Sequence, residues 1–486
     1  MLKRKWKSVA VALMLAMLSA GSMACAKAQN DSQANTGSPS PSGTAPQTNV
    51  YAENGLPKDQ KVTLKVGFFE SGMGREWFDY AMDTFKQKFP NVSFEVTYSP
   101  KIAEIINTKV AANNDGDMFD MFSGSPANLI SLAQMGKLEP QDDLWDRKTY
   151  DGSGETLKEL ATEGQFEGAP RMMNTSYVFP NSATGSGLFF DKKLFEKNGW
   201  NQNPKTWDEF VKLLEDIKAK GIIPITYPGI YPSYLEGGLS GPHKLFEIAE
   251  ANGTLSTVQD NFRHFSSPYY TSPENIERWN KIYELGQKGF FPSGVAALNH
   301  TQSQMQVLQG KAALVSTGVW VGNEMKESTP ADFVWGFMIV PMTNKPDDTK
   351  WMRLSAGGGM HYIWAAKPEL NKKWAKEFNV WTWNMDIQQM IAEKGGMLPI
   401  RKDYIENKAR ADKLQSAPKA FLEYIKTNKV RGESGFTLVT LTDPAYAQAV
   451  KVINESVTQI TEGKQDPQPK LQEAEELLKK AMANQK

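Results

Sequence analysis

Residues 62–98, VTLKVGFFESGMGREWFDYAMDTFKQKFPNVSFEVTY, contain the pattern that decides the fold. Residues 62–69 are rich in β-forming side chains and end at charge and glycine, which predicts a buried strand. Apolar residues at helical spacing over 77–89 predict a helix, and Pro90 ends it. Residues 92–98 alternate between apolar and polar, which predicts a second strand. Strand, helix, strand is the opening unit of an α/β domain.

Three further helices follow from signals later in the chain. Thr206, with Glu209 three residues on, predicts a capping box at the start of a helix that leads to the strand-like residues 222–227. Apolar residues at helical spacing predict one helix over 371–394 and another over 470–482.

The composition excludes several classes of function. The chain has 486 residues, 55 Lys+Arg, 55 Asp+Glu, one cysteine and four histidines. At roughly 150 residues per domain this length predicts two or three domains. Nucleic acid is excluded as a partner because phosphate binding needs a basic excess on one face. One cysteine cannot form an intramolecular disulfide, and the histidines are too far apart in sequence for a zinc-binding pair. No nucleophile elbow or phosphate loop occurs, so we predict no catalytic residue, metal, cofactor or enzyme activity.

The N-terminus has the features of an export signal. Basic residues precede an apolar run over 9–18, which at about ten residues is half of what a bilayer span needs and fits a signal peptide over 1–24. The sequence Ser22-Met23-Ala24-Cys25 resembles a bacterial lipobox, which predicts a lipid on Cys25 and an anchor at the extracytoplasmic face of the cell membrane. Cleavage after Ala24 to give a soluble secreted product stays open. Residues 25–57 are predicted to be the lipidated cysteine and a flexible linker, because small and polar residues dominate them.

Aromatic residues on loops are the candidate ligand contacts. Trp320 lies between two glycines after a strand predicted over 312–317, so its indole can project from a strand end; a core position is the alternative. Tyr227, Tyr231 and Tyr234 lie in a loop broken by proline and glycine, where a binding role is favoured over a core role.

Polar residues follow two predicted strands. Glu70 ends the first strand, and Ser123-Gly124-Ser125 follow a strand predicted over 117–122. Polar groups at strand ends and flat rings on loops suit a neutral ligand with many hydroxyl groups.

Several segments resemble, in consistent order, the extracellular solute-binding proteins of carbohydrate ABC importers, the family that includes maltose-binding protein. They are GDMFDMFSGSPANLISLAQMGKLEPQDDL (116–144), GLFFDKKLFEKNGWNQNPKTWDEFVKL (187–213), MQVLQGKAALVSTGVW (305–320) and GGGMHYIWAAKPELNKKWAKEF (357–378). The resemblance implies an α/β type II periplasmic-binding-protein-like fold of two lobes, with a hinge and an interlobe cleft. It places residues 61–186 plus 366–404 in lobe 1 and residues 187–364 plus 405–486 in lobe 2.

The same resemblance implies which residues contact the ligand. They are Glu70, Ser123, Gly124, Ser125, Tyr231, Tyr234, Trp320, Gly358 and Gly359. Phe189-Phe190-Asp191 stand where the family has Tyr-Tyr-Asn, so the hydroxyl groups expected there are missing.

The main functional hypothesis is a substrate-binding lipoprotein of an ABC importer that captures an oligosaccharide. Its partners would be the carbohydrate, the transmembrane subunits of the permease and, through the lipid, the membrane; the protein itself would be a monomer. Two alternatives stay open: a secreted polysaccharide-degrading hydrolase, and a sugar-sensing lipoprotein that signals to a membrane kinase.

Overall fold

The strand, helix and strand predicted at residues 62–98 form the beginning of a five-stranded sheet. The computed structural model describes residues 49–70, 72–126, 128–356 and 361–485. The first sheet has the order β2-β1-β3-β10-β4. Its strands are β1 (Val62–Phe69), β2 (Val92–Ser99), β3 (Met121–Phe122), β4 (Val178–Phe179) and β10 (His361–Ile363). β1 pairs in parallel with β2 and β3, and β10 runs antiparallel to β3 and β4.

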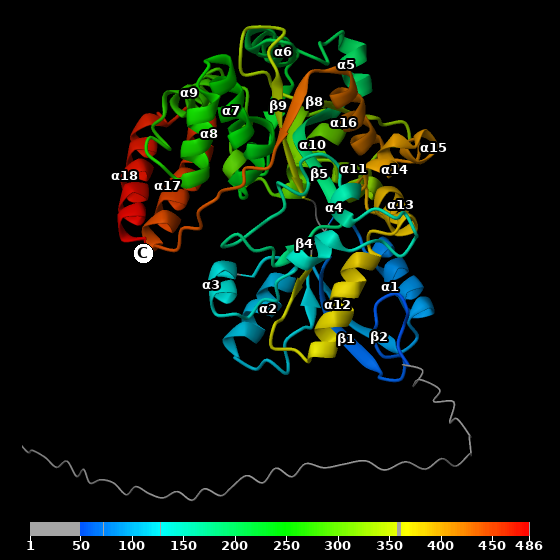
Figure 1. Ribbon diagram of the computed structural model, residues 1–486. Helices are drawn as coiled ribbons and strands as arrows, with labels where there is room; N and C mark the ends of the chain where they lie inside the picture. Colours follow the sequence, from blue (N-terminus) through cyan, green and yellow to red (C-terminus); the bar gives the residue numbers. More distant parts are fainter. Residues whose placement is uncertain (1–48, 71, 127, 357–360, 486) are drawn as a thin grey trace, which may run out of the picture. The chain divides into compact units, whose positions relative to one another are not determined.

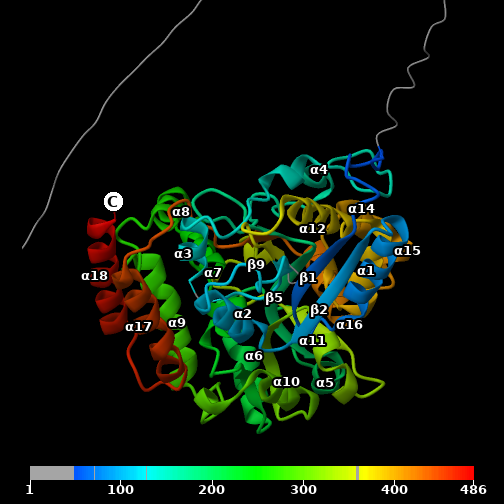
Figure 2. The ribbon, with the colours of Figure 1, turned by 90° about the horizontal axis from the view of Figure 1, so that it is seen from below.

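Packing against this sheet explains the apolar spacing of its helices. α1 (Glu76–Lys88) buries Trp77, Phe78 and Phe85, and α12 (Glu369–Trp381) buries Trp374 and Phe378. Figures 1 and 2 show both helices beside β1 and β2. The opening unit of the α/β class is therefore confirmed, whereas the strand predicted over 117–122 is only two residues long.

A second sheet is built around the long strand β5. Its order is β12-β9-β5-β7-β6, and β8 and β11 also pair with β5 (Figure 1). The strands are β5 (Ser182–Asp191), β6 (Ile223–Thr226), β7 (Ala312–Gly318), β8 (Trp335–Met338), β9 (Lys350–Ala356), β11 (Leu398–Pro399) and β12 (Val430–Glu433). The predicted strands over 222–227 and 312–317 correspond to β6 and β7.

The remaining α-helices connect and cover these sheets. They are α2 (Ile102–Ala111), α3 (Leu129–Gln134), α4 (Leu157–Leu160), α5 (Lys192–Asn198), α6 (Trp207–Ala219), α7 (Pro242–Ala251), α8 (Leu255–His264), α9 (Pro273–Gln287), α10 (His300–Leu308), α11 (Val321–Glu324), α13 (Met385–Lys394), α14 (Lys402–Glu406), α15 (Lys408–Ala411), α16 (Ser416–Thr427), α17 (Pro444–Thr461) and α18 (Gln468–Asn484). α17 packs against both α9 and α18 (Figures 1 and 2). Within the described ranges, none of the helices combines the length and the hydropathy that crossing a bilayer requires.

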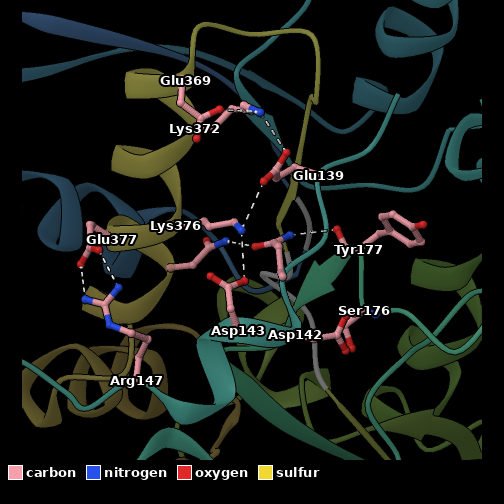
Figure 3. A network of polar contacts seen from close by, with 12 residues as sticks. Glu139, Asp142, Asp143, Arg147, Ser176, Tyr177, Glu369, Lys372, Lys376 and Glu377 are labelled. Carbon is pink, nitrogen blue, oxygen red and sulfur yellow. Dashed lines mark hydrogen bonds and ion pairs between the residues drawn. The ribbon is translucent and has the colours of Figure 1, made fainter. Parts of the chain in front are cut away.

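Ion pairs attach α12 to the segment before α4. Lys376 Nζ lies 3.0 Å from Asp143 Oδ1 and 3.3 Å from Glu139 Oε1. Arg147 donates two hydrogen bonds to the carboxylate of Glu377, at 2.6 and 2.8 Å (Figure 3). Bidentate pairs of this kind fix orientation as well as distance. They therefore hold the segment over residues 139–147 in one place along α12.

Two helix predictions need correction. The helix predicted over 371–394 is two helices, α12 and α13, because Asn384 is extended with φ −60° and ψ 145° and starts the second one. The capping box is only half formed. Thr206 accepts from the Glu209 N–H at 3.2 Å, but the Glu209 carboxylate accepts from Lys205 N–H rather than from Thr206.

The predicted limits of linker and lobes also differ from the structure. Residues 49–57 belong to the folded part, because the Tyr51 ring packs edge-on against Phe89 and its hydroxyl donates to Asn91. Backbone pairing places β10 in the first sheet and β11 in the second. The predicted lobe limits assign β10 to lobe 2 and β11 to lobe 1, so they do not follow the sheets at these strands.

A buried ion pair braces α7 against the second sheet. The side chains of Lys244 and Glu247 are each 1% exposed and their charged groups lie 2.8 Å apart. Lys244 also donates to the carbonyl groups of Val340 and Trp351, and Glu247 accepts from Met342 N–H and Trp351 N–H. These four hydrogen bonds therefore join α7 to β9 and to the connection between β8 and β9.

Lys244→Met should lower the free energy of unfolding by about 3–5 kcal/mol, because it removes the ion-pair partner of the buried Glu247 carboxylate. Urea unfolding followed by circular dichroism measures the change. Lys212→Met is the matched control, since Lys212 forms an exposed pair with Asp216 on α6 and should change the free energy by less than about 1 kcal/mol. Equal effects of the two substitutions would contradict the bracing role of Lys244.

Candidate functional site

The pairing of β5 with both neighbouring strands brings polar side chains from distant segments into one row. Ser186 pairs with Arg353 on β9 and with Gly318 on β7. Thr184 lies two residues before Ser186 and therefore on the same face of the sheet. Together with Thr317 of β7, these side chains line a cavity of 210 Å³.

A loop folded onto this face forms the next wall of the cavity. It consists of η2 (Pro232–Tyr234) and the π-helix η3 (Glu236–Ser240). A side chain at Gly237 would come within 2.8 Å of Ser186, and one at Gly238 within 2.8 Å of Leu188, so only glycine permits this approach. Ser316 Oγ of β7 accepts from Gly238 N–H at 3.1 Å and donates to the Tyr234 carbonyl at 2.7 Å. These bonds place Ser233 and Tyr234 at the cavity.

Two aromatic rings complete the lining. Trp320, at the start of α11, and Tyr234 are half-buried, with ring centroids 6.5 Å apart and an interplanar angle of 82°. A Cβ atom at Gly318 would lie 2.1 Å from the Trp320 ring, so the indole rests directly on the backbone of β7. Gly318 therefore makes room for the tryptophan ring.

Polar side chains behind these rings hold them in place. His300 Nδ1 lies 2.7 Å from Glu324 Oε1, and Gln304 Nε2 donates to Glu324 Oε2 at 2.8 Å. The Tyr234 ring lies against the imidazole of His300 with centroids 4.5 Å apart. Burial, with a contribution from Glu324, raises the pKa of Tyr234 to about 12, so its hydroxyl is neutral at physiological pH.

The predicted residues of the first sheet lie at neighbouring strand ends. Phe69 N–H donates to Ser123 Oγ at 2.7 Å, which places Ser123 beside the end of β1 where Glu70 follows. The loop that carries Glu70 reaches α11, since Asn323 Nδ2 donates to the Gly72 carbonyl at 2.6 Å. The ends of β1 and β3 therefore lie side by side in the first sheet.

Gly124 and Ser125 have structural contacts of their own. Gly124 has φ 91°, and a side chain there would come within 2.7 Å of Ile102, so packing against α2 accounts for this glycine. The Ser125 hydroxyl forms a hydrogen bond with Tyr362 of β10.

The loop tyrosines separate into two groups. Tyr227 is fully buried and its hydroxyl lies 2.7 Å from Thr461 Oγ1, so its predicted binding role is wrong and it belongs to the core. Tyr231 is 51% exposed, with its ring 6.4 Å from that of Tyr234. Three predicted residues, Cys25, Gly358 and Gly359, lie outside the described residues.

A second cavity of 290 Å³ adjoins the first, and Ser233 and Arg353 line both. Its wall includes Arg278 of α9, Glu236, and the aromatic residues Tyr269, Tyr270 and Tyr446. Sequence reasoning missed the arginines and the Ser/Thr row on β5. Alternating small polar residues in SATGSG (182–187) were the one available signal for that row.

The chain matches the family described as bacterial extracellular solute-binding proteins over residues 72–381. It belongs to this family. It is 25% identical over 309 residues to the diacetylchitobiose binding protein NgcE of Streptomyces coelicolor, a match that covers 63% of each chain. The chain thus spans less than two thirds of the length of this relative.

Solved structures show the same fold at lower identity. A chitin oligosaccharide binding protein superimposes with a TM-score of 0.65 at 19% identity, covering 87% of this chain and all of that one. The solute-binding protein RafE in complex with raffinose gives 0.62 at 19% identity with the same coverage. The predicted two-lobe α/β type II fold is therefore confirmed.

Gly318→Ala should lower the free energy of unfolding by about 1–3 kcal/mol, because its methyl group overlaps the indole of Trp320. Gly322→Ala is the matched control on the other side of Trp320, since a Cβ atom there meets its nearest neighbours at an ordinary 3.5 Å. Chemical denaturation of both variants checks the difference. If Gly318→Ala were as stable as Gly322→Ala, the indole would not rest on β7.

Proposed function

We propose that this protein is the substrate-binding lipoprotein of an ABC importer, which captures an oligosaccharide and delivers it to the transmembrane subunits of the permease. The observation that carries the proposal is the cavity in which Trp320 and Tyr234 stand beside Thr184, Ser186 and Thr317. Flat rings accept the C–H faces of sugars, and hydroxyl groups exchange hydrogen bonds with sugar hydroxyls. The names of the relatives, which refer to diacetylchitobiose, raffinose and chitin oligosaccharide, favour an oligosaccharide.

Capture would depend on movement between two lobes. The chain changes sheet between β4 and β5, between β9 and β10, and between β10 and β11, and these connections form the hinge of this proposal. The predicted hinge segment 187–191 lies inside β5 and is paired with β7 and β8, so it is not a crossing. A ligand that touches both lobes binds the closed state more tightly and shifts the population toward it. Glu70, Ser123, Gly124, Ser125, Tyr231, Gly358 and Gly359 complete the proposed contacts. The hydrogen bond from Asn323 to the Gly72 carbonyl supports a ligand surface on the β1 loop.

The proposal includes no covalent chemistry. Glycoside hydrolysis uses two carboxylates on opposite sides of the scissile bond. Among the described residues that line the two cavities, Glu236 is the only acid, and it is paired with Arg353. Release of reducing sugar from a polysaccharide panel by the purified protein, abolished by Glu236→Gln, would overturn the receptor proposal. Unchanged growth on the bound sugar after deletion of the gene would instead favour a sensor.

A melting-temperature screen against mono- and oligosaccharides identifies the ligand, because a compound that binds only the folded state raises the melting temperature. Trp320→Ala should then weaken binding of the best oligosaccharide by about 1–3 kcal/mol in calorimetry, through loss of its stacking surface. Tyr80→Ala, which removes a ring that is 36% exposed on α1, is the control and should leave affinity unchanged. Equal affinities of wild type and Trp320→Ala would remove Trp320 from the site.

The receptor is proposed to be a monomer held at the extracytoplasmic face of the membrane by a lipid on Cys25. Cys25→Ser should shift the protein from the membrane fraction to the medium, because the lipid has no other attachment point in a chain with one cysteine. Immunoblots of the two fractions give the distribution, and Ser38→Ala in the predicted linker is the control that keeps both the cysteine and the lipobox. Retention of Cys25→Ser in the membrane would contradict the anchor.

A further inference from the structure

Arg278 is a buried cation that forms no ion pair with a carboxylate among the described residues. It is 8% exposed, and Nη1 donates to the Gly241 carbonyl at 2.8 Å while Nη2 donates to Asn275 Oδ1 at 2.5 Å. Its Nε atom has no hydrogen-bond partner, and none of the described carboxylates lies within ion-pair distance of the guanidinium. Burial lowers the pKa of Arg278 to about 10, so the group remains charged at neutral pH. A buried charge that has only neutral acceptors is costly, and an anion nearby would offset that cost.

The rest of the second cavity compensates this charge only in part, because the Glu236 carboxylate attracts Arg278 without forming an ion pair with it. Glu236 is the only acid among its described lining residues, and its carboxylate is already paired with Arg353. Burial and the neighbouring cations Lys244, Arg353 and Arg278 hold the pKa of His243 well below its usual value, so this imidazole is neutral. In the part of the lining that the structure describes, the charged side chains are therefore two guanidinium groups and one carboxylate, with an excess of one positive charge.

The walls of the second cavity suit a sugar. Tyr269, Tyr270 and Tyr446 contribute aromatic surface, and Asn275 and Asn454 contribute amides. Ring faces with a few polar groups are what a sugar ring requires. Because Ser233 and Arg353 line both cavities, a ligand on Trp320 can extend directly into the second one.

We propose that the second cavity binds an acidic sugar residue, so that the ligand is a uronate-containing oligosaccharide whose carboxylate pairs with Arg278 and Arg353. This inference rests on the proposed function and specifies its substrate class. Guanidinium groups favour planar carboxylates, to which they can donate two parallel hydrogen bonds. A neighbouring residue of the same oligosaccharide stacks on Trp320.

The test compares each acid with its uncharged counterpart. Trimers of galacturonate, glucuronate and mannuronate, and their fully methyl-esterified forms, are titrated into the purified protein by calorimetry alongside neutral trisaccharides. At least one acid should bind about 10- to 100-fold more tightly than its ester, the contribution of a charge-assisted hydrogen bond. Arg278→Gln should bring the ratio of acid to ester affinity close to one, because it weakens binding of the acid and leaves the affinity for the ester unchanged. Lys451→Gln, a 70% exposed cation on α17, should leave the ratio unchanged.

Glu236→Gln should change the ratio of acid to ester affinity in the opposite direction. This second variant leaves Arg278 intact. Removal of the one carboxylate among the described lining residues should raise the ratio of acid to ester affinity several-fold. Equal binding of every acid and its ester, or a ratio that Arg278→Gln and Glu236→Gln both leave unchanged, overturns the acidic subsite. Tight binding of neutral trisaccharides alone overturns it too, but leaves the proposed function standing. No binding of any oligosaccharide overturns both.

Discussion

The hydrogen-bonded register of β5 is the constraint on which the candidate site depends. Ser186 is held between Arg353 of β9 and Gly318 of β7, so segments far apart in the chain meet at one point of the sheet. A shift of one residue would turn every side chain of β5 to the other face. Ser186 would then leave the cavity, and the loop that packs its glycines against β5 would lose its support. The position of both aromatic rings follows from this register.

The two cavities differ in the charge and shape of their linings, so each would suit a different part of the ligand. The first cavity offers rings and hydroxyl groups, and Arg353 is the one charged residue among its described lining residues. Arg353 lines the second cavity as well. The second cavity carries the positive excess of Arg278. Binding energy would therefore come from stacking at one end and from a charge-assisted contact at the other. The zero net charge of the whole chain hides this local excess, because net charge does not report how charges are distributed.

The structural features that depend on local sequence pattern could be predicted from the sequence. The strand at residues 62–69, the helix after it and the half-buried position of Trp320 after a strand end all follow from periodicity and from flanking glycine and proline. The prediction for Tyr227 was wrong, since a loop position does not reveal that a hydroxyl will meet Thr461, which is 234 residues away. Arg278 lies on an amphipathic helix where a surface position is the default, and only tertiary packing buries it.

A crystal structure of the complex with the oligosaccharide that raises the melting temperature most would show where the ligand binds. One sugar ring should stack on the indole of Trp320, beside Tyr234, and the next ring should extend past Arg353 toward Arg278. A bound oligosaccharide that leaves this cavity empty and occupies another surface would contradict this arrangement.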